Sequence, residues 1–261
     1  MNLDLKGKNA LVGGSSRGIG KASAIELAAL GANVTLVSRS PEIMAEVLNE
    51  LDQSQGQQHD FLAVDFSDYH DVKKRVKSYL SNKHIHILVN NTGGPPGGPI
   101  TEAKIQEFLQ AFNNHVLCNH LITKYVIKGM KADGYGRIIN IISTSVKAPL
   151  SGLGVSNTIR GAVANWSKTM ANELGPFGIT VNNVLPGATN TGRLQEIIID
   201  KAAKTGASEQ EISGKMKSSI PLGRFAEPKE VAAAVAFLAS PAAAYINGIN
   251  LPVDGGRTVC L

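Results

Sequence analysis

Short apolar runs alternate with longer amphipathic stretches along nearly the whole chain. Seven of these runs are rich in β-branched residues and contain four to six residues each, which predicts strands buried on both faces. The alternation predicts an α/β fold: one parallel sheet with right-handed crossovers and helices on both faces. The predicted strands cover residues 9–12, 34–37, 61–64, 85–89, 137–142, 180–184 and 249–253, and the clearest helical patterns cover 21–27, 101–131, 155–175 and 228–239.

One polar segment interrupts this alternation. Residues 192–219 insert two helical patterns, 194–203 and 208–217, between the sixth strand and the last helix. Ligands of open α/β sheets bind outside the carboxyl ends of the strands, so the position predicts a substrate loop or lid. A surface excursion without a ligand is the alternative. With no linker or repeat, the 261 residues are expected to form a single Rossmann-type domain over 1–261.

A glycine-rich turn joins the first strand to the first helix. Glycines in this context let the backbone approach a pyrophosphate, whose charge is met by free N–H groups at the helix N-terminus. The strand before the turn and the helix after it favour a dinucleotide site over a turn without a ligand. The predicted cofactor-binding residues of the turn are Gly14, Ser15, Ser16, Arg17, Gly18, Ile19 and Gly20.

The end of the second strand indicates which nicotinamide cofactor binds. An acid is usual there when the ribose 2′-hydroxyl is free, but this chain has Ser38 followed by Arg39. A hydroxyl and a guanidinium can bind a 2′-phosphate, and Arg17 adds a second cation. We therefore predict NADP(H). Asp65 and Phe66, after the third strand, suit an adenine pocket.

Composition narrows the function classes further. The net charge of +5 is spread along the chain without a basic tract, which argues against nucleic acid. The longest apolar run, 231–239, is too short to span a bilayer, so no membrane partner is expected. Cys118 and Cys260 give neither a disulfide framework nor metal spacing, and we predict a reducing, cytoplasmic location.

Several motifs in the right order resemble the short-chain dehydrogenase/reductase family, most closely its 3-oxoacyl-acyl-carrier-protein reductase-like members. They are the glycine turn, Asn90-Asn91-Thr92-Gly93, 136–141, 186–191, and the tail from 220–224 through 254–256. The resemblance implies a seven-stranded sheet, hydride transfer to or from a carbonyl, and a homotetramer (or a dimer) built on the fourth and fifth helices. It also implies that the cofactor is lined by Asn91, Thr92, Gly93, Pro186, Gly187, Thr189 and Thr191.

The chain departs from the family in its Asn-Ser-Tyr-Lys catalytic tetrad. Only the serine, at Ser143, is retained; His115, Ser156 and Arg160 stand at the other three positions, and no tyrosine lies between residues 135 and 245. A serine hydroxyl is a much weaker acid than a phenol. A guanidinium can stabilise an oxyanion but cannot shuttle a proton. The apolar stripe of 155–170 leaves Ser156 and Arg160 one turn apart on another face.

Three functions remain open from these residues. In the first, a carbonyl or acyl-thioester substrate is held by Ser143 and Arg160 and reduced by NADPH, with the proton arriving through His115 or water. His115 is a candidate donor because imidazole titrates near neutrality, and Lys147 is a second candidate. The second function is a non-catalytic NADP(H)-binding sensor or assembly protein with a degenerate tetrad. The third is a reaction without net redox change, such as an elimination.

Overall fold

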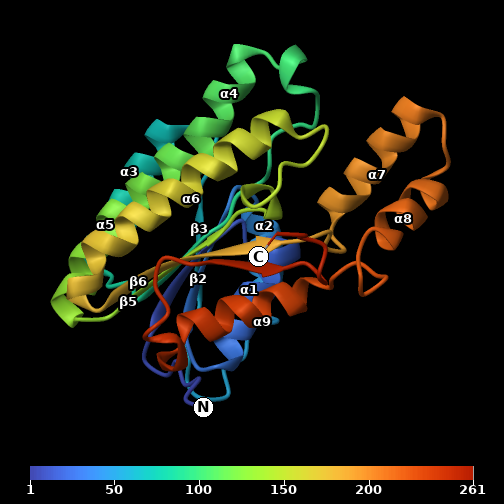
Figure 1. Cartoon of the computed structure of the whole chain (residues 1–261). Coiled ribbons are helices and arrows are strands. Elements are labelled where there is room, and N and C mark those ends of the chain that lie inside the picture. The colour runs from blue at the N-terminus through green and yellow to red at the C-terminus, as the bar shows by residue number, and fades with distance from the viewer. Residues whose placement is uncertain (261) are drawn as a thin grey trace.

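The computed structural model describes residues 1–260, and its centre is a seven-stranded parallel sheet in the order β3-β2-β1-β4-β5-β6-β7 (Figure 1). All seven strands lie where the sequence predicts them, with ends shifted by at most two residues. Their bounds are β1 Asn9–Gly13, β2 Asn33–Ser38, β3 Asp60–Ala63, β4 Ile87–Asn90, β5 Gly136–Ile141, β6 Ile179–Pro186 and β7 Asn250–Val253.

Helices cover both faces of the sheet and produce two separate cores. Alternate residues of one strand enter different cores: Ala10 and Val12 face one side and Leu11 faces the other. The first core is closed by α1 (Gly18–Ala29), α2 (Pro41–Leu48) and α9 (Pro228–Ala239). The second is closed by α3 (Tyr69–Tyr79), α5 (Cys118–Asp133) and α6 (Gly154–Leu174). This is the doubly covered Rossmann architecture that the buried apolar runs predict.

The prediction of one long helix over 101–131 is wrong in one respect, because the helix is not continuous. A 3₁₀ turn at Ile100–Glu102 and α4 (Ile105–Phe112) come first, and a π-helical turn, Asn113–Leu117, separates α4 from α5. The amphipathic period runs through both helices, so periodicity alone does not reveal the wider turn. Such π turns are frequent at functional sites, and this one carries the buried His115.

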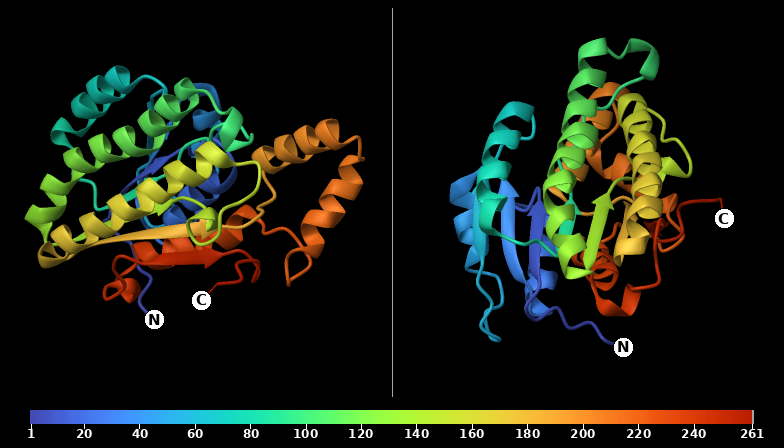
Figure 2. Two further views of the ribbon diagram at one scale, coloured as in Figure 1. Left: turned by 45° about the horizontal axis from the view of Figure 1, so that its top comes forward. Right: turned by 90° about the vertical axis from the view of Figure 1, so that its left-hand side faces the viewer.

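The predicted insertion forms a helical hairpin that projects from the carboxyl edge of the sheet (Figures 1 and 2). It consists of α7 (Gly192–Thr205) and α8 (Glu209–Ser218), joined by a small apolar cluster of Leu194, Ile198 and Ile212. An open groove of about 740 Å³ lies between the hairpin and the start of α9. Across residues 1–260, no helix has the length and apolar character needed to cross a membrane.

A ladder of four asparagines joins neighbouring strands near the carboxyl edge of the sheet. Asn90, Asn140, Asn183 and Asn250 are register partners on β4, β5, β6 and β7. Each amide nitrogen of the first three reaches an amide oxygen along this row, at 2.8, 2.9 and 2.8 Å from β4 to β7. A one-residue slip of any strand would break these buried bonds, so the ladder fixes the register of half the sheet.

We expect Asn140→Ala to lower the free energy of unfolding by about 2–4 kcal/mol, because it removes an interior rung and leaves the buried Asn90 amide nitrogen and Asn183 amide oxygen without their partners in the row. Asn250→Ala removes an end rung that is only half-buried, and should cost about 1 kcal/mol. Urea unfolding measures both values. Equal losses in the two variants would show that the ladder does not act as a connected unit.

Candidate active site

The glycine turn has the shape of a phosphate cradle. Gly14 and Gly18 both have φ of +58°, a conformation that favours glycine. A Cβ at Gly20 would overlap the Gly14 carbonyl oxygen, so the turn cannot be built with larger residues. Arg17, the N-cap of α1, makes no side-chain capping bond, which leaves the first N–H groups of the helix for a ligand. These features fit a dinucleotide pyrophosphate.

Residues distant in sequence close around this turn. Asn91 donates from its amide nitrogen to the Gly13 carbonyl at 3.2 Å. On the other side, a Cβ at Gly18 would lie 3.3 Å from the Thr191 methyl group. The predicted residues Gly14, Gly18, Asn91 and Thr191 therefore form one site at the carboxyl edge. Ser16, Ile19 and Pro186 are half-buried within the segments that flank it.

Three predicted cofactor residues have side chains that are already engaged within the protein. Ser15 is fully buried, and its hydroxyl accepts from the Val37 N–H at 2.8 Å, which ties the turn to β2. The Thr189 hydroxyl donates to the Gly187 carbonyl at 3.2 Å. Thr92 is buried and hydrogen-bonded to His115. These hydroxyls therefore hold the backbone and side chains around the site in place and do not line its surface.

The adenosine end of the site lies beyond β2 and β3. Ser38 is buried, whereas Arg17 and Arg39 are exposed and free to meet a phosphate. A hydrogen bond from the Ser67 N–H, helped by the charge of Arg39, lowers the pKa of the Asp65 carboxyl. A small cavity beside the glycine turn is lined by Gly13, Val37, Phe66, Asn90 and Asn91, among others. Phe66 thus lines this cavity, whereas Asp65 is not among its lining residues, and the adenine pocket stays a prediction.

The catalytic candidates lie at the end of β5. Ser143 follows the strand and its hydroxyl accepts from the Ser145 N–H at 3.1 Å, leaving its own proton to donate. Arg160 reaches the same strand from α6, where its Nη1 donates to the Ile141 carbonyl at 3.1 Å. Ser156 lies one helical turn earlier and is half-buried. Lys147 is exposed on the following loop.

Arg160 is a buried cation. Only 8% of its surface is exposed, and burial lowers the pKa of its guanidinium to about 10. It stays charged at neutral pH and cannot exchange protons with a substrate there. Its position suits stabilisation of negative charge, as its residue type predicts.

The expectation that His115 titrates near neutrality is wrong. The imidazole is 1% exposed, and its burial, together with the charge of Arg160, holds the pKa of His115 well below the usual value. Its Nδ1 is 2.6 Å from the Thr92 hydroxyl, and its Nε2 is buried without a partner among the described residues. His115 is therefore neutral at pH 7. It can donate a hydrogen bond or relay a proton, but it does not carry the extra proton of an imidazolium.

Comparison with known proteins agrees with this arrangement. The family described as Enoyl-(Acyl carrier protein) reductase matches residues 14–258. The 3-oxoacyl-[acyl-carrier-protein] reductase FabG of Vibrio harveyi is 34% identical over 257 residues, which cover 97% of this chain and 98% of the relative. The chain belongs to the short-chain dehydrogenase/reductase family. The proteins of this family that it resembles are oxidoreductases acting on carbonyl or hydroxyl groups.

Solved structures of short-chain dehydrogenases/reductases superpose closely on the fold. L-sorbose reductase from Gluconobacter frateurii, complexed with NADPH and L-sorbose, has a TM-score of 0.92 at 30% identity, with full coverage of both chains. A gluconate 5-dehydrogenase from Burkholderia cenocepacia, in complex with NADP and tartrate, has a TM-score of 0.87 at 28% identity, covering 100% of this chain and 98% of the other.

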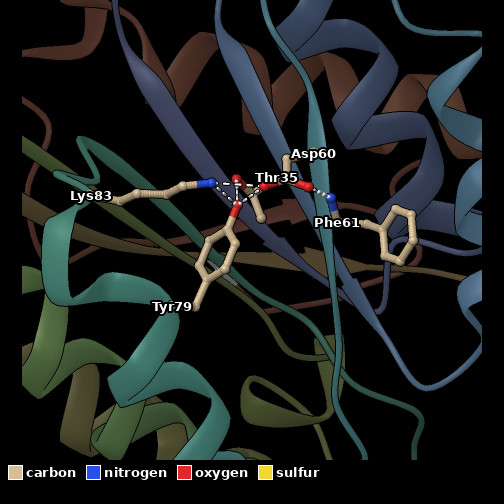
Figure 3. A network of polar contacts seen from close by, with 5 residues as sticks. All are labelled: Thr35, Asp60, Phe61, Tyr79 and Lys83. Atoms are coloured by element: carbon tan, nitrogen blue, oxygen red, sulfur yellow. Dashed lines mark hydrogen bonds and ion pairs between the residues drawn. The ribbon is translucent and has the colours of Figure 1, made fainter.

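A Tyr-x-x-x-Lys spacing occurs at Tyr79 and Lys83, but this pair lies away from the candidate catalytic residues. Lys83 donates to the Tyr79 hydroxyl at 2.6 Å, and both contact Asp60, as Figure 3 shows. Asp60 begins β3, so this network braces the amino edge of the sheet, opposite the cofactor site. Burial raises the pKa of Tyr79, which makes its phenol a poorer acid.

One connection at the site had no signal in the sequence. Arg193, at the start of α7, donates to the Pro95 carbonyl at 2.7 Å and so joins the helical hairpin to the loop 93–99. The same loop is held at its other end, where the Gly98 N–H donates to Gly152 at 2.8 Å. A backbone carbonyl can accept from any donor, so residue types alone do not specify such a pair.

The lowered pKa of His115 has a consequence for stability. As pH falls through the usual histidine range, the unfolded chain binds a proton that the folded chain does not, so the free energy of unfolding decreases. We expect His115→Asn to lose less stability than the wild type between pH 7 and pH 5, by up to about 1.4 kcal/mol per pH unit. Urea unfolding at several pH values tests this, and parallel curves for the two proteins would contradict it.

Proposed function

We propose that this protein is an NADP(H)-dependent oxidoreductase that reduces a carbonyl or 3-oxoacyl-type substrate with an altered proton donor. The observation that carries the proposal is the complete cradle of Gly14, Gly18, Asn91 and Thr191, beside a buried cation, Arg160, at the carboxyl edge. Arg17 and Arg39 support NADP(H) over NAD(H), as do the cofactors of the two structural relatives.

The cofactor, when bound, supplies a hydride for the carbonyl carbon. Ser143 donates a hydrogen bond to the carbonyl oxygen, and Arg160 stabilises the negative charge that develops there. The proton comes from water or passes through His115, whose neutral ring holds no proton to spare. Lys147, which is exposed on the loop after Ser143, is the other candidate donor. The α7–α8 hairpin acts as the lid, and the Arg193–Pro95 bond aligns it with the loop 93–99.

The protein is further proposed to assemble as a homo-oligomer, a dimer or a tetramer. Ile105, Leu109 and Phe112 lie at i, i+4 and i+7 on α4 and are 74%, 58% and 42% exposed. Such a stripe on the helix that the family resemblance assigns to the subunit contact matches the same stripe of a second copy. Cytoplasmic location remains a prediction from cysteine content.

A non-catalytic NADP(H)-binding protein is the second candidate. It is favoured by one specific observation: the site retains the fold's cofactor cradle while the neutral His115 and the serine at 156 offer no acid comparable to the family's phenol. Turnover separates the two functions, because both predict cofactor binding.

The choice of cofactor can be tested at the 2′-phosphate. We expect Arg39→Gln to weaken NADPH binding by about 10- to 100-fold through loss of a charge-assisted bond, and to leave NADH binding unchanged. Titration of nicotinamide fluorescence measures both affinities. Arg224→Gln removes one exposed charge that is paired with Glu230 and is the matched control. An equal loss for NADPH and NADH would place Arg39 outside the phosphate site.

Catalysis can be tested by NADPH oxidation with a short 3-oxoacyl thioester, small ketones and small oxo acids. We expect the wild type to turn over at least one of them. The variant Ser156→Tyr/Arg160→Lys should change the rate by no more than about 10²–10⁴-fold, which is the contribution of one general acid. If only the double variant turns over, the wild type is a binding protein. Unchanged turnover in His115→Ala/Lys147→Ala would assign the proton to water.

A further inference from the structure

The charge of Arg160 has no counter-charge in the protein. Only 8% of the Arg160 surface is exposed, and within residues 1–260 its one side-chain hydrogen bond runs from Nη1 to the neutral Ile141 carbonyl. No carboxylate of the described chain contributes to the electrostatics of this group. Buried charges are ordinarily paired, because an isolated one loses its hydration without compensation. The remaining donors of Arg160 are therefore available to an anion from outside the chain.

The space beside these donors is open. A Cβ at Gly94 would have only the Arg160 Nη2 near it, at 3.8 Å, and a Cβ at Gly93 would meet nothing within 4 Å. His115 also lies against Gly93, and its buried Nε2 has no partner among the described residues. If Thr92 donates to Nδ1, the ring carries its proton on Nε2. The Arg160 Nη2 and, in that tautomer, the His115 Nε2–H thus lie near the same glycine pair.

The phosphates of the cofactor do not account for this cation. They are bound by the glycine turn after β1, whereas Arg160 lies at the end of β5, with β4 between the two strands. Two strand spacings amount to about 10 Å. The 2′-phosphate site at Arg39 lies farther still, after β2. The anion beside Arg160 must therefore come from the substrate.

We propose that the substrate is a 2-oxo acid, whose carboxylate pairs with Arg160. The carboxylate and carbonyl oxygens of a 2-oxo acid are adjacent, so one planar guanidinium can contact both and still stabilise the alkoxide that forms. The hydride adds to the carbonyl carbon, and the electron pair of the C=O π bond moves to the oxygen. Protonation of the resulting alkoxide completes the 2-hydroxy acid. This inference rests on the proposed reductase function and narrows its substrate class.

The first experiment measures binding in the NADP⁺-saturated protein, with oxamate as a 2-oxo acid analogue and ethyl oxamate as its uncharged counterpart. We expect oxamate to raise the thermal midpoint and ethyl oxamate to have little effect. Arg160→Gln should weaken oxamate binding by about 10- to 100-fold, while Arg160→Lys keeps part of it. Arg137→Gln is the matched control, since Arg137 is a buried arginine at the opposite end of β5 that also donates to backbone carbonyls.

The second experiment compares kcat/KM for 2-oxobutanoate and its methyl ester. We expect the wild type to prefer the acid by about 10- to 100-fold and Arg160→Gln to lose that preference, whatever its absolute rate. Equal binding of oxamate and ethyl oxamate, or oxamate affinity unchanged in Arg160→Gln, would overturn the proposal. If the protein binds oxamate selectively but no carbonyl compound oxidises NADPH, the carboxylate-binding site is supported and the proposed reductase function is contradicted.

Discussion

The row of hydrogen bonds through Asn90, Asn140, Asn183 and Asn250 is the constraint on which the site depends. It fixes the register of β4 to β7, and the segments that follow β4, β5 and β6 carry Asn91, Ser143 and Thr191. A slip of one residue would invert the faces of a strand and move these side chains apart. Because the amides are buried, their bonds are strong and breaking them is costly.

The carboxyl edge of the sheet has two halves that differ in how their charged groups are exposed. The half around β1 and β2 has glycines at positive φ, an uncapped helix N-terminus and exposed arginines, all of which suit phosphates. The half around β5 holds buried donors, Arg160 and His115, with no acid to balance them. On the proposed function, cofactor and substrate are distinguished by where charge is exposed and where it is buried, because desolvation strengthens each charged interaction that a bound group makes.

The predicted replacement of the family's tyrosine and lysine by Ser156 and Arg160 would change what the site can do. A phenol beside an ammonium exchanges protons near neutral pH, whereas a buried guanidinium and a neutral imidazole hold charge and hydrogen bonds in place. Chemistry at such a site relies more on electrostatic stabilisation and substrate orientation than on a resident acid. A substrate that brings its own negative group suits this balance.

The sequence alone determined the seven strands, the glycine turn and several of the helices, though not α2 and α3, since hydrophobic period and turn residues are local properties. It also located the inserted hairpin, and through resemblance it predicts the tetrad positions. Only the tertiary structure decided what state those residues are in. The burial of His115 reversed the expected titration, the π turn interrupted a helix whose pattern is continuous, and the Ser15 and Thr92 hydroxyls proved to be bonded inside the protein. Burial and partner choice depend on atoms brought together from distant segments, which no window of sequence contains.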